Sequence, residues 1–181
     1  MQTRAPRLVA AAVLAAAVAS CAKTHAPASH QPEVPAALAL PEGEETALRL
    51  DARGTQNYEC RPKPDAPSAT GWTLVAPEAE LFDASGKKVG KHYAGPTWES
   101  IEDGSKVVGT VKARADAPAP DAIPWLLLSA TESSAGGMLG GVKSIQRIDT
   151  RGGKQPAGTC AAGEVAKVPY TAAYWFSRVR R

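Results

Sequence analysis

The sequence has little net charge and no long apolar run. Its 181 residues carry a formal charge of +3, and only +1 remains once Arg4 and Arg7 are removed with the rest of residues 1–20. So small an excess does not support nucleic-acid binding through bulk charge. The longest apolar run, from Leu8 to Ala19, has 12 residues, whereas a membrane-spanning helix needs about 20. We therefore expect neither a nucleic-acid partner nor a permanent transmembrane helix.

Histidine is also scarce, with three residues in the chain. His25 and His30 lie in a proline-rich segment that cannot hold ligands in a fixed geometry, which leaves His92 as the imidazole expected in the folded part. Zinc sites commonly need three or four His or Cys ligands. The chain also carries no complete phosphate-binding loop or dinucleotide fingerprint. The sequence thus predicts no metal site and no cofactor.

The start of the chain has the layout of an export signal: two arginines, the apolar run and then small residues. The stretch Val18-Ala19-Ser20-Cys21 resembles the bacterial lipobox, which implies a signal peptide over 1–20, cleavage before Cys21 and a diacylglycerol on its thiol. The alternative is an ordinary cleaved signal followed by a free cysteine, which is a liability in an oxidising compartment. Because Ala22 comes next, the resemblance implies a lipoprotein anchored to the outer membrane of a Gram-negative envelope.

The remaining chain divides into a tether and a folded domain. Residues 21–45 contain four prolines and no sustained period of 3.6 or 2, which predicts a disordered, semi-rigid tether. Over residues 46–181 the apolar spacing is close to two, with turn residues about every ten positions. The 16 Gly and 15 Pro disfavour a helical bundle. We predict one all-β domain, a single antiparallel β-sandwich or partly closed barrel of about eight strands.

Several strands can be recognised individually. Hairpin turns are expected at residues 83–86 and at Asp103-Gly104. In the strand after the second turn, one buried face is expected to hold Val107, Gly109, Val111 and Ala113. The run from Ile123 to Leu128 is apolar almost throughout and predicts a strand buried on both faces, with Pro124 at its entrance. Residues 168–177 alternate as a last strand, with Tyr174 and Trp175 on opposite faces.

Two cysteines remain if Cys21 is acylated. Cys60 and Cys160 are 100 residues apart, and an exported protein with two thiols usually pairs them. In the chain-entropy model a loop of this length contributes up to about 4.7 kcal/mol. We predict a structural disulfide, because redox-active pairs are normally close in sequence.

The densest polar and aromatic stretch is His92-Tyr93-Ala94-Gly95-Pro96-Thr97-Trp98-Glu99-Ser100. Together with residues 54–60, 123–128, 145–147 and 168–174, it resembles an uncharacterised family of bacterial lipoproteins and secreted fungal proteins, a domain of unknown function. The resemblance covers nearly all of residues 54–176. It implies an extracellular location and a compact domain, but no catalytic residues.

The same stretch supplies a candidate ligand cleft made of His92, Tyr93, Trp98 and Glu99. His92 is a candidate general base with Glu99 as its orienting carboxylate, although no nucleophile elbow surrounds Ser100. In the alternative structural interpretation, residues 95–96 form a sharp corner with Trp98 packed beneath it. A third interpretation is a binding cleft built from these groups.

Tryptophan offers another binding route, because an exposed indole can stack on a sugar ring. We expect Trp125 in the core and Trp175 at the surface. The leading hypothesis is a non-enzymatic, lipid-anchored envelope protein that binds an envelope glycan or a protein partner, or serves a structural role. The alternatives are a secreted hydrolase that uses His92 and Glu99, and a carbohydrate-binding module.

Overall fold

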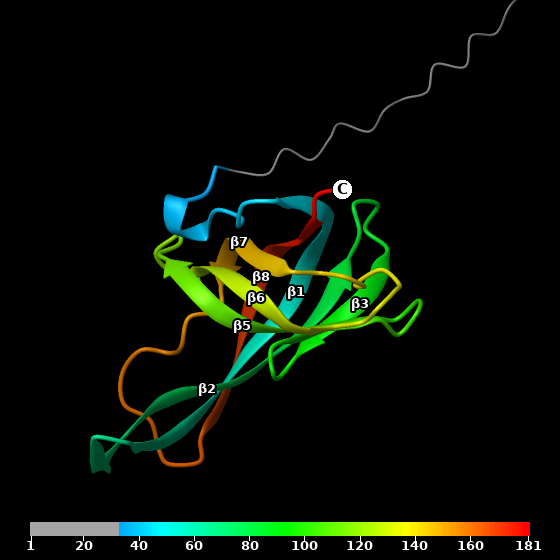
Figure 1. Ribbon diagram of the computed structural model, residues 1–181. Helices are drawn as coiled ribbons and strands as arrows, with labels where there is room; N and C mark the ends of the chain where they lie inside the picture. Colours follow the sequence, from blue (N-terminus) through cyan, green and yellow to red (C-terminus); the bar gives the residue numbers. More distant parts are fainter. Residues whose placement is uncertain (1–32) are drawn as a thin grey trace, which may run out of the picture. The chain divides into compact units, whose positions relative to one another are not determined.

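The computed structural model describes residues 33–181 (Figure 1). The expected signal peptide, the expected lipidation site Cys21 and the tether up to residue 32, with His25 and His30, lie outside the described residues. In the described part, no helix combines the length and the apolar character that a membrane crossing requires. The elements are η1 (Ala36–Leu38), β1 (Glu44–Lys63), β2 (Ala66–Phe82), β3 (Lys88–Tyr93), β4 (Thr97–Ser100), β5 (Lys106–Ala115), β6 (Trp125–Ser133), β7 (Ser144–Gly152) and β8 (Val165–Val179).

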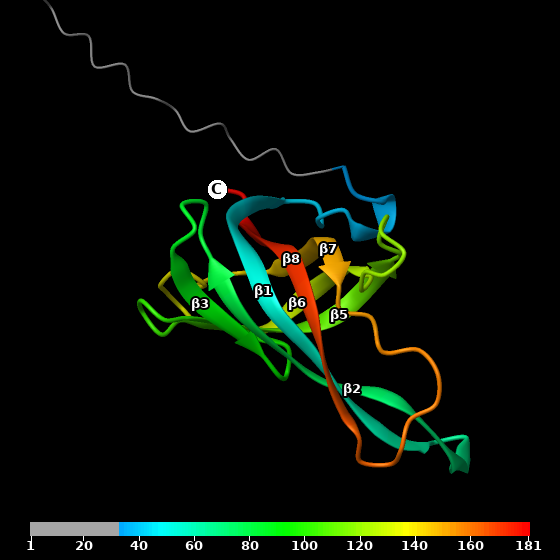
Figure 2. The ribbon, with the colours of Figure 1, turned by 180° about the vertical axis from the view of Figure 1, so that it is seen from behind.

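All eight strands belong to one antiparallel sheet that closes in a ring. Each strand pairs with the next one in the chain, and β1 also pairs with β8, so the sheet has no break between its first and last strands. Figure 2 shows β1 and β8 side by side over most of their length. The prediction of one all-β domain of about eight antiparallel strands is confirmed. The strands form one sheet closed in a ring, which is nearer to the expected partly closed barrel than to the expected sandwich.

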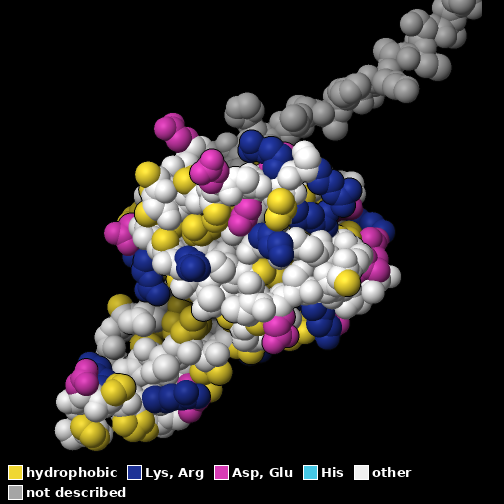
Figure 3. Space-filling view, in the orientation of Figure 1, with side chains coloured by type: hydrophobic (Ala, Val, Ile, Leu, Met, Phe, Trp, Pro, Cys, Tyr) yellow, Lys and Arg dark blue, Asp and Glu magenta, His cyan; other side chains and the backbone are white. Residues whose placement is uncertain are grey.

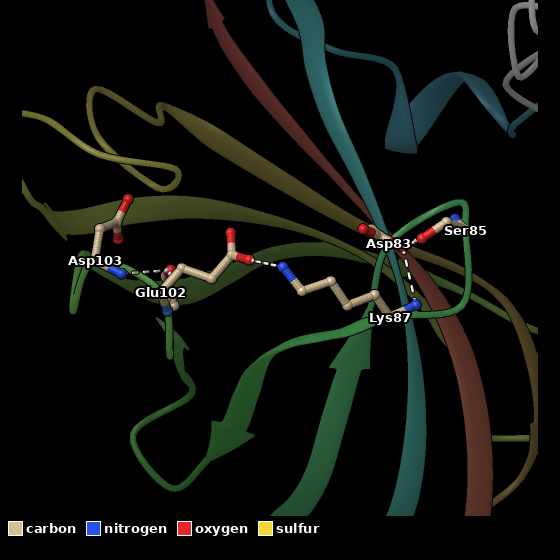
Figure 4. A network of polar contacts seen from close by, with 6 residues as sticks. Asp83, Ser85, Lys87, Glu102 and Asp103 are labelled. Carbon is tan, nitrogen blue, oxygen red and sulfur yellow. Dashed lines mark hydrogen bonds and ion pairs between the residues drawn. The ribbon is translucent and has the colours of Figure 1, made fainter.

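The two predicted hairpin turns are confirmed, and polar side chains fix both. Asp83 accepts hydrogen bonds from the backbone of Ser85 and Lys87, and Asp103 accepts them from Ser105 and Met138. Gly86 and Gly104 supply the positive φ angles of +82° and +69° that these turns require. An ion pair between Lys87 and Glu102 links the two turns (Figure 4). These contacts tie the β2–β3 turn to the β4–β5 turn.

Beyond the ring, β1 and β2 continue as an extension, residues 58–74, which we call the arm (Figure 1). The start of β8 still pairs with Tyr58 and Glu59 at the base of the arm. The predicted disulfide between Cys60 and Cys160 is confirmed, and it ties the arm to the connection between β7 and β8. The Thr70 hydroxyl donates a hydrogen bond of 2.7 Å to the carbonyl of Cys160. The arm is therefore a continuation of β1 and β2 that is fastened to the β7–β8 connection.

The wall of the ring is buried on its inner face and on part of its outer face. The inner cluster includes Leu81, Trp98, Leu128, Ile145, Tyr174 and Phe176. A second cluster lies outside the wall beneath η1 and contains Leu38, Trp125, Ile148, Ala173 and Trp175. The Gln146 side chain holds η1 in place by donating a hydrogen bond of 2.6 Å to the Leu38 carbonyl. The first part of β6, Trp125 to Leu128, is thus buried on both faces, as the sequence predicts, whereas its last three residues are exposed.

The expectation that alternate residues of β5, from Val107 to Ala113, share one buried face is only partly correct. Val107 and Gly109 are buried within the ring, but the register with β6 shifts between Val111 and Ala113. Such a bulge turns the following side chains to the opposite face. Ala113 consequently packs against the outer cluster. The alternating sequence carried no sign of this extra residue.

Candidate functional site

A cavity of about 380 Å³ runs from the surface into the ring. Its inner end is lined by buried side chains, among them Gln56, His92 and Trp98. Its mouth is lined by Leu74 and Val75 of β2, which are 51% and 50% exposed, and by Val111 of β5, which is 43% exposed. Figure 3 shows apolar side chains gathered where the arm leaves the body of the ring. The cavity is therefore open at one end and mostly apolar.

Three aromatic rings close the inner end of the cavity. His92 and Trp98 face each other across the β3–β4 ladder, and their rings stack with centroids 4.4 Å apart and an angle of 13° between planes. Tyr174 of β8 meets both rings edge-on, at 5.1 Å and 5.2 Å. Offset and edge-on contacts of this kind favour a fixed arrangement of the rings. The inner wall is thus a rigid aromatic surface.

His92 is a neutral imidazole in this setting. Burial lowers its pKa to about 3, and the positive charge of Arg147 acts in the same direction, whereas the bond to Thr97 opposes the shift. The Nδ1 atom lies 2.8 Å from the Thr97 carbonyl oxygen, which can only accept a hydrogen bond. Nδ1 therefore carries the proton and Nε2 is left as an acceptor.

Arg147 brings a positive charge to the cavity wall. Its Nε and Nη2 atoms donate hydrogen bonds of 3.2 Å and 2.9 Å to the Pro124 carbonyl. Within the described chain, no carboxylate forms an ion pair with this guanidinium. The second cation of the wall is the exposed Arg114, and among the described lining residues there is no Asp or Glu. The cavity is therefore electropositive.

Neutral polar groups line the inner end or contact its lining: Gln56, Tyr58 and Tyr174 line the cavity, whereas Tyr170 does not. The Tyr58 hydroxyl donates a hydrogen bond of 2.6 Å to the Gly153 carbonyl, and the hydroxyls of Tyr170 and Tyr174 lie 3.4 Å apart. Burial raises the pKa of all three phenols, so they remain protonated at neutral pH. Gln56 is 2% exposed, and its Nε2 makes no hydrogen bond of ordinary geometry, although the amide lies near enough to Tyr170 to lower that phenol's pKa.

The structure brings together only two of the four residues proposed for the cleft. His92 and Trp98 line the cavity, whereas Tyr93 and Glu99 lie on the outer face of the same two strands. The Tyr93 hydroxyl donates a hydrogen bond of 2.7 Å to Glu99, which lowers the Glu99 pKa. The side chains of Lys91 and Lys106 pair with the same carboxylate at 3.4 Å and 3.3 Å. His92 is thus oriented by the Thr97 carbonyl and not by Glu99.

Trp175 is 3% exposed, so the expectation that it lies at the surface is wrong. The alternation did place it on the face opposite Tyr174, but η1 covers that face, and the guanidinium of Arg49 lies 5.5 Å from the indole centroid. Trp98 and Trp125 are also buried. Trp72, on the arm, is partly exposed. An exposed indole platform of several tryptophans is not formed by the described residues.

Sequence reasoning missed the polar residues of the cavity. Gln56 and Arg147 lie in segments that carry the family resemblance, and Tyr174 lies in the well-patterned last strand. Their strands were recognisable, but the inward direction of Gln56 and Arg147 depends on a ring closure that no local pattern reveals. Alternation in β8 was the one signal that could have placed Tyr174 inside.

Groups that enzymes use as nucleophiles or metal ligands are scarce in the described wall. The described lining residues include no Ser, Thr, Cys or Lys that a neutral His92 could activate as a nucleophile. Nowhere in residues 33–181 do three or more His, Cys, Asp or Glu side chains gather in a group that could hold a metal ion.

None of the curated proteins compared with this chain matches it. A protein-family model described as "Protein of unknown function (DUF3455)" matches residues 41–178. This range covers well over half of the chain and contains all eight strands apart from the last residue of β8. The prediction of an uncharacterised family is confirmed, and the chain belongs to the DUF3455 family of proteins of unknown function.

Proposed function

We propose that this protein is a lipid-anchored envelope protein whose ring-shaped domain binds a small, mostly apolar molecule without transforming it. The observation that carries the proposal is the cavity of about 380 Å³ that opens between the arm and β5. Small-molecule sites typically measure about 300–1,000 Å³ and combine apolar walls with a few polar groups. The aromatic inner end and the apolar mouth fit this description.

The geometry gives less support to the two alternatives. A hydrolase needs an activated nucleophile, and the bond from His92 to the Thr97 carbonyl leaves Glu99 without a part in orienting the imidazole. A carbohydrate-binding module needs exposed aromatic faces, and Trp98, Trp125 and Trp175 are all buried. Binding inside the cavity would use Trp98 together with His92 and Tyr174, which line it in their buried positions.

Anchoring is the second part of the proposal and rests on the sequence Val18-Ala19-Ser20-Cys21. Attachment of lipid to Cys21 would hold the domain at the envelope surface, with the tether as spacer. The test is the mass of the mature N-terminal peptide in wild type and in Cys21→Ala. A wild-type protein without lipid mass that stays entirely in the soluble fraction would contradict the anchoring.

Ligand binding is tested with N-phenyl-1-naphthylamine, an uncharged fluorophore whose emission rises in apolar surroundings. We expect saturable binding to the wild type and clear loss of binding in Ala94→Trp, because Ala94 is exposed and lines the cavity. Ala84→Trp is the matched control, since Ala84 is an equally exposed alanine in the β2–β3 turn and does not line the cavity. Equal binding by the two variants, or no saturable binding by the wild type, would overturn the proposal.

A further inference from the structure

We propose that the molecule held in the cavity is an amphiphile with a carboxylate at one end, and that Arg147 binds this carboxylate. The inference rests on the proposed function, and it adds the chemical class of the ligand. It follows from the charge of the wall, from the hydrogen-bond donors that the wall presents and from the shape of the cavity.

The first observation is an uncompensated charge. Arg147 is half-buried in the wall, and the described lining residues contain a second arginine but no acidic residue. A cation in partly apolar surroundings loses hydration, and an anion beside it restores favourable electrostatics. The outer wall shows the usual arrangement, because Lys91 and Lys106 there share the carboxylate of Glu99. The cavity provides the cation without the anion.

The second observation concerns hydrogen-bond donors. A guanidinium has five N–H groups, and the Pro124 carbonyl receives bonds from Nε and Nη2. The Tyr174 hydroxyl lies near enough to the guanidinium to interact with it, and this interaction partly offsets the rise that burial causes in the pKa of that phenol. A guanidinium can still present the pair of N–H groups at its end to the two oxygens of a carboxylate. Gln56 adds a buried amide nitrogen without a bond of ordinary geometry. These groups donate hydrogen bonds, as an anion requires.

The third observation is that the other polar side chains of the inner end are uncharged, so they do not attract an anion by charge. The low pKa of His92 keeps this imidazole uncharged at neutral pH, so it adds no positive charge to the inner end. The tyrosine hydroxyls are protonated and uncharged as well. Arg114 lies exposed at the mouth, where water and salt weaken its effect. Selection for an anion therefore depends on Arg147.

The volume and the lining of the cavity limit the size and the chemical character of the rest of the ligand. Its volume of about 380 Å³ lies at the small end of the range for ligand sites, and its walls are mainly aliphatic and aromatic. A medium-length acyl chain or one aromatic ring system fits such a space. Decanoate and decan-1-ol are suitable probes, because they share the same chain length and differ at one end in charge.

The experiment measures the displacement of N-phenyl-1-naphthylamine by each probe at pH 7.5 on the folded protein, with decanoate below its micelle concentration and decan-1-ol below its solubility limit. We expect the wild type to bind decanoate at least tenfold more tightly than decan-1-ol, because a hydrogen-bonded charge pair in a protected site gives a factor of about ten or more. Arg147→Gln should lose this preference and bind decan-1-ol about as well as before. Arg147→Lys keeps the charge and should keep part of the preference.

Arg151→Gln is the matched control, since Arg151 lies on the same strand, is exposed and does not line the cavity. The comparison of two probes on the wild type requires no mutation, so a folding defect in an Arg147 variant leaves the test intact. If the wild type binds both probes with equal affinity, the carboxylate inference is wrong while ligand binding stands. If the fluorophore does not bind and neither probe interacts in calorimetry, the proposed function itself fails.

Discussion

The inner and outer faces of the β3–β4 hairpin use similar residue types in opposite ways. His92 and Trp98 point into the ring, and their sequence neighbours Tyr93 and Glu99 point out of it. Inside, the imidazole is 3% exposed and its pKa is low. Outside, the Glu99 carboxylate is held ionised by Tyr93 and two lysines. Proximity in sequence therefore says little about shared chemistry in a strand, because alternate side chains lie in different surroundings.

The largest effect is expected from Trp98→Ala on the inner face. Trp98 is 1% exposed and contacts His92, Tyr174 and Phe176, so its removal leaves a large hole among rigid rings. We expect a loss of about 3–5 kcal/mol in the free energy of unfolding, measured by urea denaturation. Tyr93→Ala on the outer face is the comparison and should cost clearly less. Equal losses would show that the two faces do not differ in packing.

The next effect is a pH dependence caused by His92. The unfolded chain protonates this imidazole near pH 6.5, whereas the folded protein resists protonation down to about pH 3. Stability is therefore full above about pH 6.5 and is lost as the pH falls towards 3, by about 1.4 kcal/mol per pH unit within this window. Urea unfolding at pH 7, 5.5 and 4.5 measures the slope.

His92→Gln is the control for this prediction, because glutamine does not titrate. The stability difference between wild type and variant should shrink as the pH falls from 7 to 4.5. A constant difference would mean that His92 is not the source of the slope.

A smaller effect is expected from Gly54→Ala. This variant tests how closely β1 and β2 approach each other in the wall of the ring. A Cβ at this position would lie 2.1 Å from the Glu78 carbonyl oxygen and 2.5 Å from the Ala79 Cα, both on the backbone of β2. The strands must move apart, and we expect a cost of about 1–3 kcal/mol. Gly136→Ala is the control, because nothing lies within 4 Å of the added atom there. Melting temperatures that fall equally in both variants would refute the close approach.

The smallest effect is expected from Glu99→Gln on the outer face. Its ion pairs with Lys91 and Lys106 are partly exposed, and pairs of this kind contribute up to about 1 kcal/mol. Unfolding in low and high salt should show a small loss that salt reduces further, and binding of N-phenyl-1-naphthylamine should not change. If probe binding were lost, the Glu99 carboxylate would influence the cavity, and the outer face would not be independent of the inner one.

Local patterns predicted the strands and turns of the fold well. Gly86 and Gly104 marked two hairpins, and the alternation around Tyr174 indicated a strand with one face in the core. The closure of the sheet was not predictable, because it depends on β1 pairing with β8 across most of the chain. The cover that η1 gives Trp175 also escaped prediction, since its residues lie in a segment that reads as tether.

The candidate site was predicted only in part, for the same reason. His92 and Trp98 were found because they stand in a dense motif. Arg147 comes from a strand far along the chain, and its role depends on the absence of an acidic neighbour in the described wall. A sequence shows which residues are present, but the lack of a neighbour in space appears only in the folded protein.

The disulfide has a consequence for proteolysis. Cys60 and Cys160 enclose strands β2 to β7 in a covalent loop. Hydrolysis of one peptide bond between residues 61 and 159 leaves a single covalent molecule, heavier by one water. Two fragments separate only after the thiols are reduced. A nicked molecule would therefore run as an intact one on a non-reducing gel. A ligand-binding assay could detect the damage to the cavity where such a gel shows no change in size.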